Sequence, residues 1–137
     1  MAISQTSEGS KFFYKKFSLL KKWLSRVIEK ENFKTGDISI VFTSDSYLLS
    51  INREYLKHDY YTDVITFDYS KESIISGDIL ISIDRVKENA RNYNVEFIDE
   101  LDRVILHGIL HLLGYSDAND PDISIMRSKE TTYLLKR

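Results

Sequence analysis

The sequence predicts an α/β (α+β) fold: a small, mixed sheet of about four strands, packed with helices around one central, buried helix. Three observations carry this prediction. Short β-branched runs alternate between apolar and polar residues within residues 36–84, and apolar residues recur at helical spacing from residue 85 onward. Residues 104–113 are apolar nearly all round, as is typical of a helix surrounded by neighbours. Strands followed by helices therefore indicate a sheet covered by helices.

The N-terminal third is expected to contain a leader, a short strand and a helix. Residues 1–10, "MAISQTSEGS", are polar and lack the apolar segment of a signal peptide, so we expect a flexible leader there. The remaining residues, 11–137, contain no Pro/Gly/Ser-rich break and are expected to form one domain. A fourth strand is expected before Phe17, where "KFFYKKF" fits either a short strand or the approach to a helix, and "LLKKWLSRVIEKE" has the apolar spacing of a helix.

Three further strands and a helix follow. Ile38, Ile40 and Phe42 alternate along "GDISIVFTS", which predicts a strand buried on at least one face. "SDSYLLSINREYL" returns to helical spacing, with Ser44 or Asp45 placed to cap its start. The apolar runs "TDVITFDYS" and "SGDILISID" predict two strands that are neighbours in a hairpin or meander.

The last third is predicted to be helical throughout. "RVKENARNYN" forms one predicted helix, and a longer one begins near Val95 to Phe97 and runs to Leu113. A final helix is expected after Pro121. The long helix is the central one of the predicted fold.

The composition excludes several classes of protein. The chain has no cysteine, so it contains neither a disulfide nor a thiolate metal site, and any transition metal must be bound by imidazole and carboxylate groups. No apolar run approaches the roughly 20 residues of a membrane span, so we expect a cytoplasmic protein without membrane contact. The net charge of -2 argues against indiscriminate nucleic-acid coating, although residues 11–34 are basic. This basic segment is expected to be a solvated helix face, with phosphate binding as the alternative.

Two of the three histidines lie in "VILHGILHLLGYSDAND". His107 and His111 are four residues apart, so on a helix they project from the same face and can bind one ion. An isolated pair of this kind also fits two hydrogen-bonded core histidines. Gly114 stands where a helix ends in the left-handed conformation, and Asp117 follows three residues later. Two imidazoles and a carboxylate separated by a turn therefore predict a three-ligand metal site with an open position.

The offsets of four, seven and ten residues also occur in the metzincin protease pattern HExxHxxGxxH. In that pattern the glutamate after the first histidine is the general base. Gly108 occupies its place here, and a glycine cannot accept a proton. A metzincin-like metalloprotease without its glutamate base therefore remains only an alternative.

The motif "HGILHLLGYSD" resembles the HGxLHLxGYDH signature of the YbeY family of bacterial metal-dependent endoribonucleases and ribosomal RNA maturation factors. "INREYLKHDYYTDVITF" and "SGDILIS" are similar to two upstream segments of that family, in the same order, so the resemblance covers about residues 38–133. It implies a four-stranded mixed sheet and a central helix that bears the metal. It also implies ribosomal RNA and the small ribosomal subunit as partners.

Three positions depart from the family pattern. The third histidine of the family aligns with Asp117 and its preceding aspartate with Ser116; a carboxylate is also a zinc ligand, so we expect the site to persist. Many family members have an arginine directly after the tyrosine, where this chain has Leu56. Arg53 or Lys57 is the candidate to contact RNA phosphate instead, although ordinary surface charge explains both equally well.

The resemblance therefore implies a hydrolase that cuts single-stranded RNA with one divalent ion, expected to be zinc, bound by His107, His111 and Asp117. No catalytic residue beyond these ligands is assigned. Besides the metzincin-like protease, two alternatives stay open: a non-catalytic ribosome-assembly factor with a structural metal, and an iron oxygenase with two histidines and one carboxylate. The sequence leaves the oligomeric state undetermined.

Overall fold

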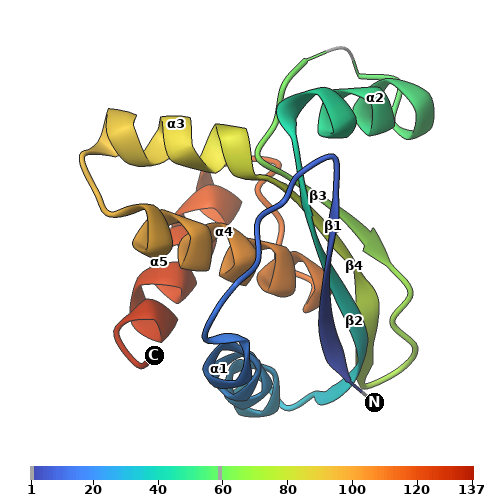
Figure 1. Ribbon diagram of the computed structural model, residues 1–137. Coiled ribbons are helices and arrows are strands. Elements are labelled where there is room, and N and C mark those ends of the chain that lie inside the picture. The colour runs from blue at the N-terminus through green and yellow to red at the C-terminus, as the bar shows by residue number, and fades with distance from the viewer. Residues whose placement is uncertain (1, 59) are drawn as a thin grey trace.

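The structure is a computed structural model that describes residues 2–58 and 60–137. Its strands are β1 (Ile3–Glu8), β2 (Lys34–Thr43), β3 (Val64–Asp68) and β4 (Ile74–Ser82). Its helices are α1 (Phe17–Lys30), α2 (Asp45–Tyr55), α3 (Ile83–Tyr93), α4 (Phe97–Leu112) and α5 (Asp120–Leu134). The predicted α/β class, with a small mixed sheet and a central helix, is confirmed (Figure 1).

The four strands form one sheet in the order β1-β2-β4-β3. The pairs β1–β2 and β2–β4 are parallel, whereas β3 pairs antiparallel with β4. The predicted hairpin between the last two strands is therefore confirmed. This order makes β3 an edge strand, so one of its sides is available to line a site.

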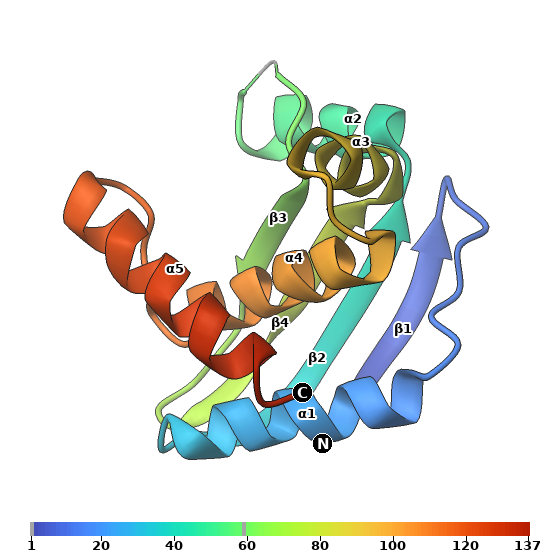
Figure 2. The same cartoon turned by 90° about the vertical axis from the view of Figure 1, so that its left-hand side faces the viewer.

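Most of the core lies between the sheet and the helices α1, α4 and α5, which Figures 1 and 2 show on one side of it. Ile38, Ile40 and Phe42 of β2 are at most 1% exposed, which confirms the predicted alternation. They face the apolar stripe of α1 and the nearly all-buried helix α4. A smaller cluster of Leu48, Ile65 and Leu80 packs α2 against β3 and β4.

Local capping explains where several helices begin. Ser44 caps α2, since its side chain accepts a hydrogen bond from the backbone N–H of Tyr47. Ser82 caps α3 in the same way, and Asn119 caps α5, just before Pro121. The last two caps fix the directions of the helices that surround α4.

The N-terminal strand differs from the sequence-based expectation. Instead of a flexible leader over residues 1–10 and a strand in "KFFYKKF", the structure has β1 at Ile3–Glu8 and no helix or strand over residues 10–14; Met1 lies outside the described residues. The reason is that β1 is an edge strand held by its backbone pairing with β2, and only Ile3 among its side chains is buried. Its polar sequence therefore gives no apolar period to detect.

Helix α4 lies close to the sheet at Gly108. A Cβ built on this glycine would come within 2.7 Å of Cγ2 of Ile79 in β4. The glycine therefore permits the close approach of α4 to β4. In the described part of the chain, no helix has the length and apolarity needed to cross a membrane.

Candidate metal centre

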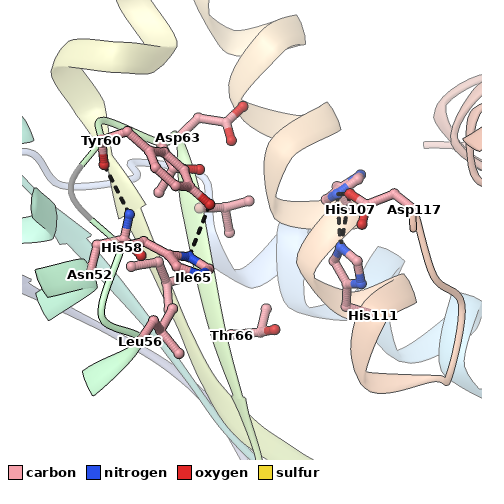
Figure 3. Close-up of a pocket in the computed structure, with 12 residues that line it drawn as sticks. Asn52, Leu56, His58, Tyr60, Asp63, Ile65, Thr66, His107, His111 and Asp117 are labelled. Carbon is pink, nitrogen blue, oxygen red and sulfur yellow. Dashed lines mark hydrogen bonds and ion pairs between the residues drawn. The ribbon is translucent and has the colours of Figure 1, made fainter. Parts of the chain in front are cut away.

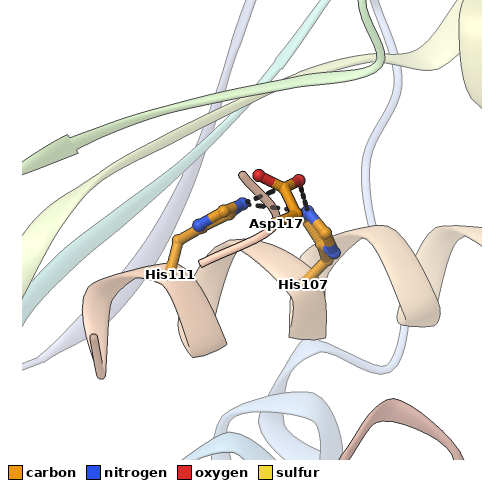
Figure 4. A group of neighbouring side chains, drawn as sticks. All are labelled: His107, His111 and Asp117. Carbon is orange, nitrogen blue, oxygen red and sulfur yellow. Dashed lines mark hydrogen bonds and ion pairs between the residues drawn. The ribbon is translucent and has the colours of Figure 1, made fainter. Parts of the chain in front are cut away.

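The end of α4 brings Asp117 back toward the two histidines. Gly114 has a φ of +103°, and the backbone N–H groups of Gly114 and Tyr115 donate to the carbonyls of His111 and Leu110. This is the double hydrogen-bond pattern of a Schellman motif, for which glycine is the favoured residue. The chain leaves the helix through this turn and passes back over the face that carries the histidines (Figure 4).

The three predicted ligands converge on one point. Oδ2 of Asp117 lies 3.3 Å from Nε2 of His107 and 3.5 Å from Nε2 of His111, and the two Nε2 atoms are 2.9 Å apart. Ligand atoms about 2.0–2.1 Å from one ion at tetrahedral angles are about 3.4 Å apart. Two of the three separations match that value, and the third is shorter. The group therefore fits a single small divalent ion (Figure 4).

The remaining ring nitrogens make hydrogen bonds that orient both imidazoles. Nδ1 of His111 lies 3.1 Å from the carbonyl oxygen of Tyr115, which only accepts, so this nitrogen carries the proton. Nδ1 of His107 lies 2.6 Å from Oε2 of the buried Glu130 and donates to it. In its neutral form, each ring then carries its lone pair on Nε2, and the lone pairs of the two rings face each other. Such an arrangement requires a cation between them, either a shared proton or a metal ion.

Glu130 belongs to a row of charges behind His107. Nη1 of Arg103 lies 3.1 Å from Oε1 of Glu130, and Nη2 of Arg103 lies 2.7 Å from Glu100. Both glutamates are at most 5% exposed, so each carboxylate depends on these partners for its hydrogen bonds. The row links α4 and α5 and holds the imidazole of His107 in place.

The electrostatics of the two histidines differ. Burial alone lowers the pKa of His107, but the hydrogen bond and charge of Glu130, together with the charge of Asp117, raise it above its usual value. The pKa of His111 is lowered by burial and by the neighbouring His107. Although burial opposes it, the contacts of Glu130 with His107 and Arg103 lower its pKa, so Glu130 is a carboxylate.

The candidate ligand group, His107, His111 and Asp117, opens into a cavity of about 300 Å³ (Figure 3). Its other walls come from the end of α2, the following loop and strand β3, and its lining includes Asn52, Leu56, His58, Tyr60, Thr62, Asp63, Val64, Ile65 and Thr66. The cavity therefore joins the edge of the sheet to the face of α4 that carries the histidines. A ligand in it reaches both the proposed ion and the loop.

Asp63 is a cavity residue that the sequence did not mark as functional. Burial raises its pKa, although the nearby charges of Arg103 and His107 oppose the effect. Its Oδ2 lies 3.3 Å from the side-chain amide of Asn89 and 3.9 Å from Arg103. A carboxyl group with a raised pKa beside a metal-ligand group is suited to proton transfer. The signal in the sequence was only its place in the family-like "TDV" segment.

The two residues considered for phosphate contact are not part of this cavity. Arg53 lies on the exposed side of α2, and Lys57 follows the helix with a φ of +57°. Neither is among the described residues that line the cavity, whereas Leu56 is. The basic residues of α1, such as Lys21 and Lys22, are exposed and also lie outside the lining.

Comparisons with known proteins identify the family of this chain. The family model described as Endoribonuclease YbeY matches residues 3–137. A protein named Endoribonuclease YbeY from Azobacteroides pseudotrichonymphae is 46% identical over 99% of this chain and 98% of its own length. The protein of that name from Flavobacterium psychrophilum is 55% identical over 82% of this chain and 80% of its own length.

A solved structure has the same fold. The solution structure of a Thermotoga maritima protein superposes with a TM-score of 0.70 at 31% identity, covering 97% of this chain and 87% of the other. Because the family model spans nearly the whole chain and the relatives match it over most of their own lengths, this chain belongs to the YbeY family.

Proposed function

We propose that this chain is a metal-dependent endoribonuclease, a hydrolase that cuts RNA phosphodiesters, and that it acts on ribosomal RNA during maturation of the small ribosomal subunit. Membership of a family whose relatives are named endoribonucleases supports the nuclease activity. The observation that carries metal dependence is the convergence of His107, His111 and Asp117 at the wall of a cavity.

The ligand set suits zinc. Two imidazole nitrogens and one carboxylate oxygen leave one tetrahedral position open, as in catalytic rather than structural zinc sites. The hydrogen bonds on both Nδ1 atoms orient the rings and leave the Nε2 lone pairs for the ion. When bound, such an ion polarises a phosphoryl oxygen and lowers the pKa of water.

The remaining chemistry falls to the chain itself. Glu130 keeps the ring of His107 oriented, and the walls of the cavity position the RNA strand. We assign proton transfer to the carboxyl group of Asp63, because it lines the same cavity and its pKa is raised by burial. Replacing Asp63 with asparagine is expected to lower the maximum single-turnover rate by about 10²- to 10⁴-fold while the ion remains bound.

The proposal includes one YbeY-like hydrolase domain that begins at β1 rather than at residue 11, because β1 completes the sheet. Its site of action is the cytoplasm, where ribosomal RNA is processed in bacteria. The non-catalytic assembly factor and the metzincin-like protease are not favoured. At the base position of a metzincin, Gly108 instead permits close packing against Ile79.

A cleavage assay tests the proposal. Zinc-loaded protein is mixed in excess with small-subunit ribosomal RNA precursor, with and without a chelator. We expect cleavage in single-stranded segments that stops with the chelator and returns when zinc is restored. RNA that stays intact with fully loaded protein contradicts the proposed activity, and cleavage that is unaffected by complete metal removal contradicts metal dependence.

The same assay tests the two candidate phosphate contacts. Since Arg53 and Lys57 are exposed and lie outside the cavity lining, replacing either with alanine is expected to change the maximum rate less than threefold. A more than tenfold decrease with Lys57→Ala would instead assign Lys57 the role that the family arginine has in other members.

A further inference from the structure

We propose that His58 and Tyr60 form a stacking subsite for one unpaired nucleobase at the mouth of the cavity. The subsite deepens the proposed function, because it specifies what part of a nucleic acid the wall opposite the metal centre recognises. Both residues lie on the loop between α2 and β3 and line the same cavity as His107 and His111 (Figure 3).

The two rings already form a stack. Their centroids are 5.2 Å apart with an interplanar angle of 20°, and the phenol hydroxyl of Tyr60 lies 2.9 Å from Nδ1 of His58. Tyr60 is 56% exposed and His58 is also exposed, so the pair presents aromatic surface to solvent. An aromatic face of this kind stacks on any nucleobase.

Neighbouring tyrosines are engaged differently. Tyr55 packs edge-on against Phe67, and Tyr61 lies beneath the guanidinium of Arg85, which is 5.3 Å from its ring centroid. Neither of these tyrosines is among the described residues that line the cavity. Tyr60 therefore combines exposure, an existing ring stack and a place in the cavity wall.

Asn52 holds this loop in position. Its side-chain amide donates to the backbone carbonyl of Tyr60 at 2.9 Å, and its backbone carbonyl accepts from the backbone N–H of His58 at 3.0 Å. Asn52 is 1% exposed, so the anchor is buried while the rings are not. Because the anchor uses the backbone of Tyr60, removing the ring leaves the loop attached.

The adjacent wall suits a base rather than a phosphate. Leu56, Val64 and Ile65 supply apolar surface, and the hydroxyls of Thr62 and Thr66 supply hydrogen-bonding groups. A base within a duplex has both faces covered by its neighbours, whereas an unpaired base has a face free for stacking. The occupant is therefore a single-stranded segment whose backbone passes the metal centre while one base stacks on the His58–Tyr60 pair.

Binding of a six-nucleotide single-stranded oligodeoxyadenylate to the full-length, zinc-loaded chain tests the subsite without cleavage of an RNA strand. Fluorescence anisotropy is expected to give a dissociation constant about tenfold higher for Tyr60→Ala than for wild type. Tyr60→Phe, which keeps the ring, and Tyr93→Ala, which removes an exposed tyrosine elsewhere, are expected to stay within twofold. A second set of oligomers carries one abasic site, placed at a different position in each oligomer. At one position, the missing base is expected to raise the dissociation constant of wild type about tenfold but that of Tyr60→Ala less than twofold.

Equal affinity of Tyr60→Ala and wild type overturns the subsite, as does an equal effect of every abasic position on both proteins. An RNA oligomer of the same base sequence, used in the cleavage assay, keeps the two proposals apart. Weakened binding by Tyr60→Ala together with no cleavage by wild type supports the subsite and contradicts the nuclease. Cleavage by wild type together with unchanged binding by Tyr60→Ala supports the nuclease and contradicts the subsite.

Discussion

Nδ1 of His107 lies 2.6 Å from Oε2 of Glu130, a buried carboxylate 23 residues further along the chain. The contact ties the first metal-ligand candidate on α4 to helix α5. Because Arg103 binds the other oxygen of Glu130, the carboxylate is fixed from two sides. Carboxylates that accept from a ligating imidazole orient the ring and raise its basicity.

Replacing Glu130 with glutamine is expected to weaken zinc binding about 10- to 100-fold, because the variant keeps the shape of the side chain but loses the charge that orients His107. Competition with a zinc-chelating dye measures this affinity, and circular dichroism verifies folding. Glu88→Gln, which removes an exposed carboxylate on α3, is the matched control. Equal zinc affinity of Glu130→Gln and wild type would show that the contact has no influence on the ion.

Asp117 is expected to be replaceable by histidine but not by alanine. Its side chain is 50% exposed on the loop after α4, so either change leaves the core intact. Asp117→Ala removes a ligand and is expected to weaken zinc binding more than tenfold, whereas Asp117→His supplies the ligand found in the family signature. The same dye competition checks both, with Asp120→Asn as a nearby control. Unchanged affinity in Asp117→Ala would remove this residue from the ligand set.

Gly108→Ala tests the close approach of α4 to β4. Alanine favours a helix by about 1 kcal/mol over glycine, yet the added Cβ would meet Cγ2 of Ile79 at 2.7 Å. We expect the clash to dominate and to lower the free energy of unfolding by about 1–3 kcal/mol, as measured by urea denaturation. In an Ile79→Ala background the same change is expected to cost less. A stabilised single variant would contradict the packing role of Gly108.

Glu31 joins the end of α1 to α5 and to the turn before Asp117. Its carboxylate accepts from the hydroxyls of Tyr115 and Tyr133 and from Nζ of Lys129. Burial alone raises its pKa, but these hydrogen bonds and the charge of Lys129 lower it below the usual 4.5. A lowered pKa stabilises the fold above about pH 4.5, and this contribution is lost as the pH falls through the folded-state pKa.

Glu31→Gln is therefore expected to lower the free energy of unfolding at pH 7 by roughly 1 kcal/mol, with a difference from wild type that shrinks as the pH falls toward 3. Urea denaturation at several pH values measures this trend. Glu29→Gln, at an exposed position of α1, is expected to change stability by less than about 0.5 kcal/mol. A difference for Glu31→Gln that is the same at every pH would contradict the charged role.

The sequence predicted those parts of the molecule that depend on local periodicity. The alternation at Ile38, Ile40 and Phe42 located β2, and the offsets from His107 through Gly114 to Asp117 predicted that these side chains converge in a group that could hold a metal ion. Each of these signals lies within about ten residues, where the geometry of one strand or one helix and its cap fixes the outcome.

Features that depend on tertiary contacts were not predictable in this way. Strand β1 is polar and is held by backbone pairing, so its side chains have no pattern to detect. Glu130 and Asp63 reach the site from α5 and from the loop just before β3, and each is an ordinary acid in its local sequence. Their roles arise from burial and from partners distant along the chain.

The most direct measurement of the central claim is single-turnover cleavage of small-subunit ribosomal RNA precursor by His111→Ala. The variant loses one ligand of the proposed ion, and a core of this size does not require a metal to form. We expect a folded protein, as judged by its thermal unfolding transition, with no detectable cleavage. A folded variant that cleaves the precursor as fast as wild type would contradict a metal centre at His107, His111 and Asp117 as the site of the reaction.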